Sequence, residues 1–375
     1  MDMKWCRAAV LLLLLGIFPL TAAADNTEGV DTSAEAALLM EQQSGRVLFE
    51  KQAHEKQNIA SITKIMTAVL ALESGKWKQS TKISENAYGV EGSSLYLKPG
   101  ETMTLKDLTT GLMLRSGNDA AVAVAEFVGG STEGFVYMMN EKAHDIGMEN
   151  TQFANPHGLD EGGDHYSTAY DMALLMRYAM QKERFREVTG LKTYEAPQPG
   201  NGKRVWKNKN KLLTSMYEYT TGGKTGYTRS AGRTLVSSAR KNDMGLIAVT
   251  LDAPSDWKDH ISMFEWGFSS FELFQLGKAD ETLNSGYREN GRLFLPRDFY
   301  YPLKEDERND VSRSVSLSEQ DNHYPKGISA AGKITWTLED QPIHSMPVFI
   351  DQPEEKNQGW FRTFYECVQM FMGGR

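Results

Sequence analysis

Three short strings along the chain combine residue types that can carry out acyl transfer through a serine. In order, they are Ser61-Ile-Thr-Lys64, Ser116-Gly-Asn118 and Lys224-Thr-Gly226. A serine hydroxyl is a weak nucleophile until a base removes its proton, and a lysine amine can be that base when its pKa is lowered. Each string alone is weak evidence, but the ordered set predicts one site with a hydroxyl, two amines and an amide.

The first string is expected to open a helix, because apolar residues over 62–72 recur at helical spacing. Residues three apart share a helix face, so the amine of Lys64 comes within reach of the Ser61 hydroxyl. The same Ser-x-x-Lys pattern occurs at 238–241 and 255–258. The former falls in a predicted strand, where such residues point to opposite faces, and the latter falls in a loop. Ser61 is therefore the candidate nucleophile.

The second string lies between two predicted helices. Ser116 can relay a proton between the first lysine and a leaving amine, and the Asn118 amide can hold a substrate backbone carbonyl. A similar string, Ser84-Glu-Asn86, has no strong helix before it. Polar loop residues of this kind usually only form turns.

The third string comes just before a run of strands. Lys224 can lower the pKa of the first lysine and attract a carboxylate. Thr225 can donate a hydrogen bond to such a carboxylate, and Gly226 lets a substrate backbone approach the strand closely. The string is thus expected to bind substrate rather than to attack it.

Acyl transfer also needs donors for the oxyanion that forms in the transition state. The backbone N–H groups of Ser61 and Tyr227 are the natural pair. His157, in the loop Asn155-Pro-His-Gly158, is a further candidate for the site. A loop histidine is more often structural, so both interpretations of His157 stay open.

Apolar spacing around these strings predicts a mixed α/β fold. Strand patterns occupy 36–40, 46–49, 233–239 and 246–251, and helical patterns occupy 62–72, 104–112, 120–130, 134–145, 168–178 and 260–268. Thr104 and Thr168 are expected to cap two of the helices. Most helices fall between the early and the late strands, so we expect one sheet with a helical insertion.

Beyond this region the pattern changes. We expect a catalytic domain over 25–277 and a small β-rich domain over 278–353, with strand patterns at 333–338 and 347–350. The segment 358–375 places its aromatic and apolar residues on one side of a helical wheel. It is too short and polar to span a bilayer, and we expect it to lie in the membrane interface. Docking on its own domain is the alternative.

Residues 1–24 have the features of a secretory signal: basic residues, a short apolar run and a small-residue cleavage site. An uncleaved N-terminal anchor is the alternative. Cleavage would remove Cys6 and leave Cys367 as the only cysteine, so no internal disulfide is expected. The chain has 375 residues and a net charge of −8, which gives no indication of nucleic-acid binding.

The strings and their flanking sequence resemble those of serine D-alanyl-D-alanine carboxypeptidases, the low-molecular-weight penicillin-binding proteins. Matching stretches are Ala60–Ala68, Leu114–Ala121, Asn155–Leu159, Tyr166–Met172 and Gly222–Thr228. The resemblance is dense over about 33–272 and looser elsewhere. Within the family, the chain is most similar to the sporulation-type enzyme of bacilli, which trims the spore cortex.

This resemblance implies a penicillin-recognising, β-lactamase-like sheet-and-helix domain, a β pedestal and an amphipathic C-terminal anchor. It also implies removal of the terminal D-alanine from peptidoglycan stem peptides, acylation by β-lactams, no metal or other cofactor, and a place on the outer face of the cytoplasmic or forespore membrane. By motif, the implied roles are Ser61 as nucleophile, Lys64 as base, Ser116 and Asn118 as the second element, and Lys224, Thr225 and Gly226 as the third.

One departure concerns the anchor for the substrate carboxylate. Family members often place an arginine after the late strands, but Pro254-Ser-Asp-Trp-Lys258 contains none. Lys258 and Lys224 remain the candidates.

Two alternatives share the three strings. A class A β-lactamase also needs a glutamate that activates water, and neither Glu149 nor Glu161 lies in a convincing context for one. The intact Ser61 and Lys64 argue against a non-catalytic penicillin sensor. A zinc peptidase is not indicated, because the chain has no His-Glu-x-x-His motif.

Overall fold

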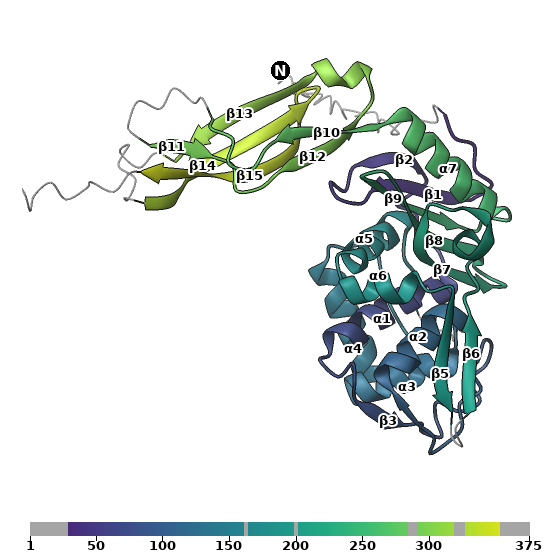
Figure 1. The fold of residues 1–375 in the computed structure, drawn as a ribbon. Helices are drawn as coiled ribbons and strands as arrows, with labels where there is room; N and C mark the ends of the chain where they lie inside the picture. Colours follow the sequence, from purple (N-terminus) through teal and green to yellow (C-terminus); the bar gives the residue numbers. More distant parts are fainter. Residues whose placement is uncertain (1–28, 161–163, 199–201, 284–290, 319–326, 353–375) are drawn as a thin grey trace, which may run out of the picture.

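The computed structural model describes residues 29–160, 164–198, 202–283, 291–318 and 327–352. At the centre of the larger domain lies a five-stranded antiparallel sheet with the order β2-β1-β9-β8-β7 (Figure 1). Its strands are β1 (Ala36–Glu41), β2 (Val47–Lys51), β7 (Thr220–Thr228), β8 (Gly232–Lys241) and β9 (Met244–Leu251). Both predicted hairpins, β1–β2 and β8–β9, are confirmed.

Helices cover both faces of this sheet, which explains why residues 36–40 of β1 are all apolar instead of alternating between apolar and polar. Successive strand residues point to opposite faces. Leu38 and Met40 pack into the core shared with the helical insertion, whereas Ala37 and Leu39 pack against the helix α7 (Asp256–Ser270) on the other face. All six residues of β1 are buried as a result.

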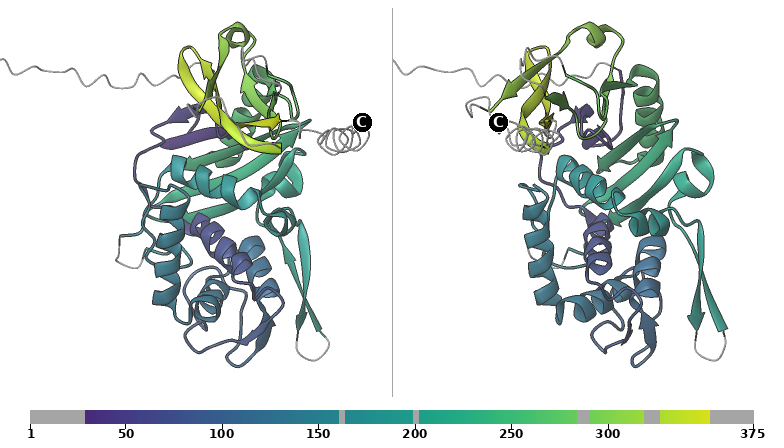
Figure 2. Two further views of the ribbon diagram at one scale, coloured as in Figure 1. Left: turned by 90° about the vertical axis from the view of Figure 1, so that its left-hand side faces the viewer. Right: turned by 60° about the vertical axis from the view of Figure 1, so that its left-hand side comes forward.

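The helical insertion leaves the sheet after β2 and returns at β7, as predicted (Figure 2). It contains α1 (Lys64–Glu73), α2 (Leu105–Arg115), α3 (Asn118–Gly129), α4 (Thr132–Asp145), α5 (Ala169–Met180) and α6 (Glu183–Thr189), and α7 (Asp256–Ser270) follows the sheet. The caps expected at Thr104 and Thr168 are confirmed, since each hydroxyl accepts a hydrogen bond from a backbone N–H three residues on, at 3.0 Å.

Several local elements differ from the sequence-based prediction. Ser61 lies in a 3₁₀ turn, η1 (Ala60–Thr63), and α1 begins only at Lys64. Strand β7 begins four residues before the expected Lys224, because Thr220 and the glycines after it pair with β8. The prediction missed the hairpin of β5 (Thr193–Gln198) and β6 (Gly202–Lys207), the short pair β3 (Ser80–Lys82) and β4 (Thr102–Thr104), and a π-helical turn over Leu212–Met216.

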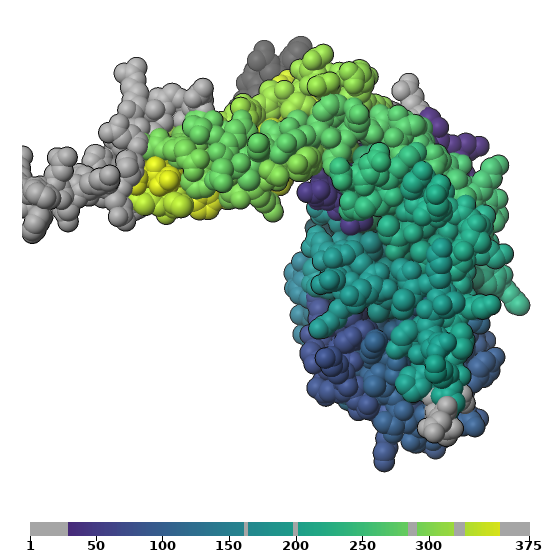
Figure 3. All heavy atoms as spheres, in the orientation of Figure 1, coloured from purple at the N-terminus to yellow at the C-terminus, as the bar shows by residue number. Residues whose placement is uncertain are grey.

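The smaller domain is β-rich and projects from the sheet end of the larger one (Figure 3). It contains β10 (Glu272–Gly277), β11 (Arg292–Phe294), β12 (Phe299–Leu303), a 3₁₀ turn (Asp306–Asn309), β13 (Val311–Leu317), β14 (Gly327–Leu338) and β15 (Gln341–Gln352). Strand β10 precedes the expected boundary at residue 277 but pairs with β12. The buried Trp336 centres this core and donates its indole N–H to the Leu276 carbonyl at 3.1 Å.

Arg46, at the β1–β2 turn, links the two domains. Its guanidinium forms an ion pair with Glu307 at 2.5 Å and donates to the Pro302 carbonyl at 2.6 Å. It also lies 5.2 Å from the ring centres of both Phe271 and Tyr301.

The expected signal at 1–24 and amphipathic segment at 358–375 lie outside the described residues. Within the described part of the chain, no helix has the length and apolar character needed to cross a membrane.

Candidate active site

The turn that carries Ser61 is fixed against the strands of the sheet. The hydroxyl of Thr234, on β8, donates to the Ile59 carbonyl at 3.0 Å. A Cβ added at Gly226 would lie 2.9 Å from the Ser61 backbone nitrogen, closer than a real Cβ can approach. The absence of a side chain at Gly226 therefore lets the end of β7 pack directly against the turn.

Lys64 connects Ser61 to the rest of the site. Its buried Nζ lies 2.8 Å from Ser61 Oγ, 2.7 Å from Asn118 Oδ1 and 2.6 Å from the His157 carbonyl oxygen. The amide and carbonyl oxygens can only accept, so a neutral amine would donate both of its hydrogens to them. Its lone pair then faces Ser61, whose hydroxyl can donate to it. This is the arrangement that proton removal from Ser61 requires.

Burial lowers the pKa of Lys64 well below its ordinary value, because the charged ammonium loses its hydration. The positive charges of Lys224 and Lys209 lower this pKa further, and Asp119 opposes them. Burial, with help from Lys209, also lowers the pKa of Lys224 to about 7. The site thus favours the neutral form of the Lys64 amine far more than water does.

Ser116 and Lys224 form a second hydroxyl–amine pair. Ser116 follows the last residue of α2 and adopts a left-handed conformation, with φ of 66°. Its Oγ accepts from Lys224 Nζ at 2.9 Å, and the same Nζ donates to the Thr225 carbonyl at 2.6 Å. A non-glycine residue in this conformation is strained, and such strain is common at functional sites.

Asn118 opens α3 and is oriented by the loop before β4. Its Nδ2 donates to the Glu91 carbonyl at 2.6 Å, which fixes Oδ1 toward Lys64. Its backbone N–H donates to the Ser93 carbonyl at 2.7 Å. Nδ2 carries two hydrogens, so one donor remains in addition to the bond to Glu91.

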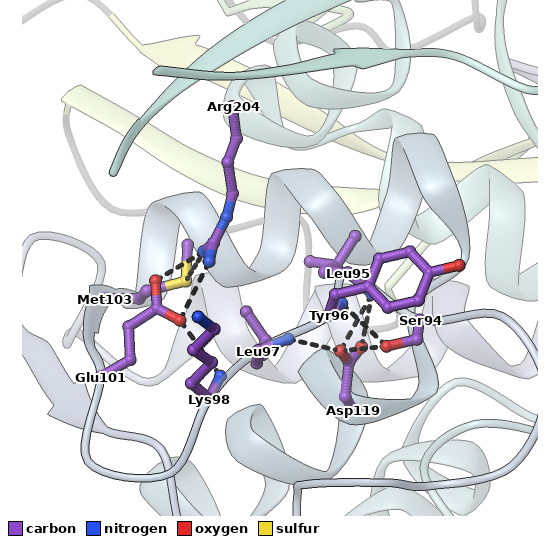
Figure 4. Close-up of polar contacts among 9 residues, drawn as sticks. All are labelled: Ser94, Leu95, Tyr96, Leu97, Lys98, Glu101, Met103, Asp119 and Arg204. Carbon is purple, nitrogen blue, oxygen red and sulfur yellow. Dashed lines mark hydrogen bonds and ion pairs between the residues drawn. The ribbon is translucent and has the colours of Figure 1, made fainter. Parts of the chain in front are cut away.

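Asp119 holds that loop in place, a role the sequence analysis did not identify. Its buried carboxylate accepts from the Ser94 hydroxyl at 2.6 Å and from the backbone N–H groups of Leu95 and Leu97 at 2.9–3.2 Å (Figure 4). Further along, Glu101 pairs with Arg204 of β6 at 2.6 Å (Figure 4). The wall around Asn118 is therefore anchored at both ends.

His157 lies at the site, but it contributes its backbone carbonyl rather than its ring. Burial, and secondarily the charge of Lys64, lowers the pKa of the imidazole to about 3, so the ring is neutral near pH 7. The next residue, Gly158, has φ of +86°, and a Cβ there would lie only 1.9 Å from the Ala60 carbonyl oxygen. The loop can contact the Ser61 turn only because residue 158 is glycine.

A cavity of about 270 Å³ lies beside Ser61. The lining residues are Ser61, Ser93, Ser116, Lys209, Thr225, Gly226, Tyr227, Arg233, Asp256 and Trp257. Tyr227 is 69% exposed at its rim. The structure thus brings all eight predicted site residues to one place, since Lys64, Asn118 and Lys224 bond to the serines or to each other just behind the lining.

The similar strings elsewhere in the chain do not reach this cavity. The Ser238 hydroxyl bonds to that of Thr221 at 2.7 Å. Ser255 is exposed at the start of α7, and Ser84 and Asn86 both bond to Glu126. The three predicted strings therefore converge on the cavity, whereas these copies lie elsewhere in the fold.

Several residues that line the cavity were not among the predicted site residues. Lys209 donates from Nζ to the Ser93 hydroxyl at 2.9 Å, and Arg233 pairs with Asp256 at 2.7 Å. Lys258, one of the two expected carboxylate anchors, is exposed and does not line the cavity. No local pattern marks Lys209 or Arg233, because each is an isolated cation whose partner comes from elsewhere in the chain. Among the described residues, no group of three or more metal-binding side chains could hold an ion.

A hydroxyl paired with a buried lysine of lowered pKa, beside a glycine-bearing edge strand of a helix-covered sheet, defines a serine acyl-transfer site of the Ser-x-x-Lys type. Residues 21–255 match the family described as D-alanyl-D-alanine carboxypeptidase, and residues 268–356 match the C-terminal domain of penicillin-binding protein 5. The chain belongs to the D-alanyl-D-alanine carboxypeptidase family.

Individual relatives agree with this assignment. The chain is 38% identical over 330 residues to D-alanyl-D-alanine carboxypeptidase DacF of Bacillus subtilis, covering 82% of this chain and 84% of the relative. It is 34% identical over 386 residues to DacC of Escherichia coli, covering 93% and 91%. The solved structure of penicillin-binding protein 5 from Haemophilus influenzae superimposes with a TM-score of 0.74 at 27% identity, covering 87% of this chain and 98% of the other. The predicted α/β catalytic domain, the β-rich domain after it and the enzyme class are confirmed, whereas the expected C-terminal helix lies outside the described residues.

Proposed function

We propose that the enzyme removes the terminal D-alanine from peptidoglycan stem peptides through an acyl-enzyme on Ser61. Neutral Lys64 takes the Ser61 proton as the hydroxyl attacks the carbonyl of the penultimate D-alanine. The N–H groups of Ser61 and Tyr227 stabilise the oxyanion, and Ser116 relays the proton to the departing amine. Water then hydrolyses the ester, with Lys64 again as base. The observation that carries this proposal is the hydrogen bonding of Lys64, which leaves its lone pair for Ser61.

In this mechanism the second and third strings hold the substrate. The remaining Asn118 donor binds a backbone carbonyl of the peptide, and Gly226 allows the peptide to run along the end of β7. Thr225 lines the cavity beside Ser61, where in this mechanism its hydroxyl would bind the terminal residue of the substrate. Penicillins enter the same way and acylate Ser61.

The test is an assay of free D-alanine after incubation with a diacyl tripeptide that ends in D-Ala-D-Ala. We expect release of D-alanine, together with one long-lived fluorescent-penicillin adduct that maps to Ser61. A sensor would bind penicillin without releasing D-alanine, and a β-lactamase would rapidly turn the drug over. Asp256 is the only carboxylate among the described residues that line the cavity, and both of its oxygens are bound by Arg233. This favours the carboxypeptidase over the lactamase.

Replacing Lys209 with methionine should shift the pH profile of kcat/KM. The positive charge of Lys209 lowers the pKa of Lys64, so its removal raises that pKa. The base works only when neutral, and the acid limb of the profile should therefore move to higher pH. Exposed Lys82, on β3, provides the matched control as Lys82→Met. An unchanged acid limb in Lys209→Met, measured by penicillin acylation rates, would contradict the electrostatic role.

For location, we infer export by the signal at 1–24 and peripheral membrane binding through 358–375. The support is the composition of both segments. A protein that lacks 358–375 should stay soluble when mixed with anionic vesicles and keep full D-alanine release. Co-sedimentation of the shortened protein with the vesicles would refute the anchor.

We also infer a role in maturing the spore cortex. The support is the resemblance to the sporulation-type enzyme and the 38% identity to the Bacillus subtilis relative. A deletion strain should form cortex with altered peptide side chains, measured by muropeptide analysis. An unchanged cortex would contradict this role and would favour a role in the vegetative cell wall.

A further inference from the structure

We propose that Arg233, held in place by Asp256 and Trp257, binds the free C-terminal carboxylate of the substrate and restricts cleavage to the last residue. This inference rests on the proposed function, since it concerns the same cavity. A peptidase that releases only a terminal residue must recognise the charge that distinguishes a chain end from a chain interior. Arginine suits this task, because its planar fork matches a carboxylate with two parallel hydrogen bonds.

The guanidinium of Arg233 is held along one edge only. Its Nη2 donates to the two oxygens of Asp256 at 2.7 and 2.9 Å, and its Cζ lies 5.6 Å from the centre of the Trp257 ring. Among the described residues, neither Nε nor Nη1 has a hydrogen-bond partner. The side chain is 40% exposed and lines the cavity beside Ser61. The opposite edge of the fork is thus oriented and available for a ligand.

The backbone around Arg233 is rigid as well. It pairs with Tyr227 across the β7–β8 ladder, and its carbonyl accepts from Ala253 N–H at 2.9 Å. The neighbouring Thr234 fixes the Ser61 turn. The arginine and the nucleophile therefore share one support, so their separation is set by the sheet.

The other cations near the cavity are less suited to this role. The amine of Lys224 is buried and already donates to Ser116 and to the Thr225 carbonyl. Lys209 donates to Ser93, and Lys258 lies outside the cavity. Because Asp256 balances only one positive charge, Arg233 and Lys209 together leave the lining net positive. A carboxylate that enters beside Thr225 would therefore be attracted by this net positive charge.

The experiment compares Arg233→Gln and Arg233→Lys with the full-length enzyme on two substrates: the diacyl tripeptide as free acid and as C-terminal amide. Arg233→Gln should lower kcat/KM on the acid by about 10- to 100-fold, the loss typical of a charge-assisted hydrogen bond, and change it on the amide by less than about threefold. On the acid, Arg233→Lys should have a kcat/KM between those of the wild type and Arg233→Gln. Lys258→Gln, which changes an exposed cation outside the cavity, should match the wild type on both substrates. Equal losses on acid and amide, or no loss on the acid, would overturn the assignment.

A second readout separates this inference from the proposed function. Acylation by benzylpenicillin should slow in Arg233→Gln, whereas acylation by its methyl ester, which lacks the carboxylate charge, should not. Stoichiometric labelling of the variant by the ester also shows that it folds. If wild-type enzyme releases no D-alanine, the proposed function fails, but the acid-to-ester ratio still decides the role of Arg233. An unchanged ratio would overturn that role.

Discussion

Ser61→Ala is expected to abolish both the penicillin adduct and the release of D-alanine, with kcat falling by at least about 10⁴-fold. The variant removes the oxygen that is proposed to attack the substrate, while the amine of Lys64 keeps its hydrogen bonds to Asn118 and to the His157 carbonyl. The fold should be preserved, since among the described residues the Ser61 hydroxyl forms a hydrogen bond only with Lys64. Intact-protein mass spectrometry after incubation with penicillin measures the adduct directly.

Ser255→Ala is the matched control, because Ser255 is three residues before a lysine in the same Ser-x-x-Lys pattern. Its exposed hydroxyl caps nothing in α7. This variant should retain wild-type adduct formation and turnover. A stable adduct on another residue of Ser61→Ala, or normal turnover by that variant, would show that the nucleophile has been wrongly assigned.

Gly158→Ala is expected to impair both stability and catalysis. Its φ of +86° costs a side-chain-bearing residue about 1–2 kcal/mol. The added Cβ would also lie 1.9 Å from the Ala60 carbonyl oxygen and 2.8 Å from Thr63 Oγ1, so the loop or the Ser61 turn must move. Displacing a nucleophile by about 1 Å can cost about 100-fold in rate. We expect a loss of this order in the acylation rate, beyond the loss in unfolding free energy.

The control for this prediction is Gly147→Ala. Gly147 has nearly the same conformation, with φ of +82°, but nothing lies within 4 Å of the position that a Cβ would take there. The Gly147→Ala variant should lose only the unfolding free energy that its backbone conformation costs, and its acylation rate should be unchanged. Chemical denaturation and penicillin acylation rates measure the two effects separately. Similar acylation rates in both alanine variants would mean that the contact between Gly158 and Ala60 does not position Ser61.

Sequence was sufficient wherever function depends on neighbours along the chain. Helical spacing brings Lys64 to Ser61, and the ends of two helices bracket Ser116 and Asn118. Alternation and turn residues predicted the hairpins β1–β2 and β8–β9, and apolar periodicity predicted the helical insertion. These features are local, so a single sequence contains the information needed to infer them.

Even here, the local prediction was imperfect at Ser61, which lies in a 3₁₀ turn rather than in α1. The turn begins at Ala60, whose φ of 48° is unusual for alanine. Contacts with Thr234 and Gly158 from distant parts of the chain accompany that conformation. Helical spacing along the sequence does not reveal such contacts. The predicted helix therefore began one turn too early.

The tertiary structure alone decided which isolated residues join the site. Asp119 is an ordinary acidic residue in the sequence, and only the fold shows that its carboxylate holds the backbone of Leu95 and Leu97. Arg233 and Asp256 lie 23 residues apart and meet only because β8 and the start of α7 are adjacent in space. The sequence thus determined the chemistry that the strings can perform, since reactive groups at fixed spacing are encoded locally. The lowered pKa of Lys64 and the cations around the cavity depend on burial and on contacts across the chain, which only folding creates.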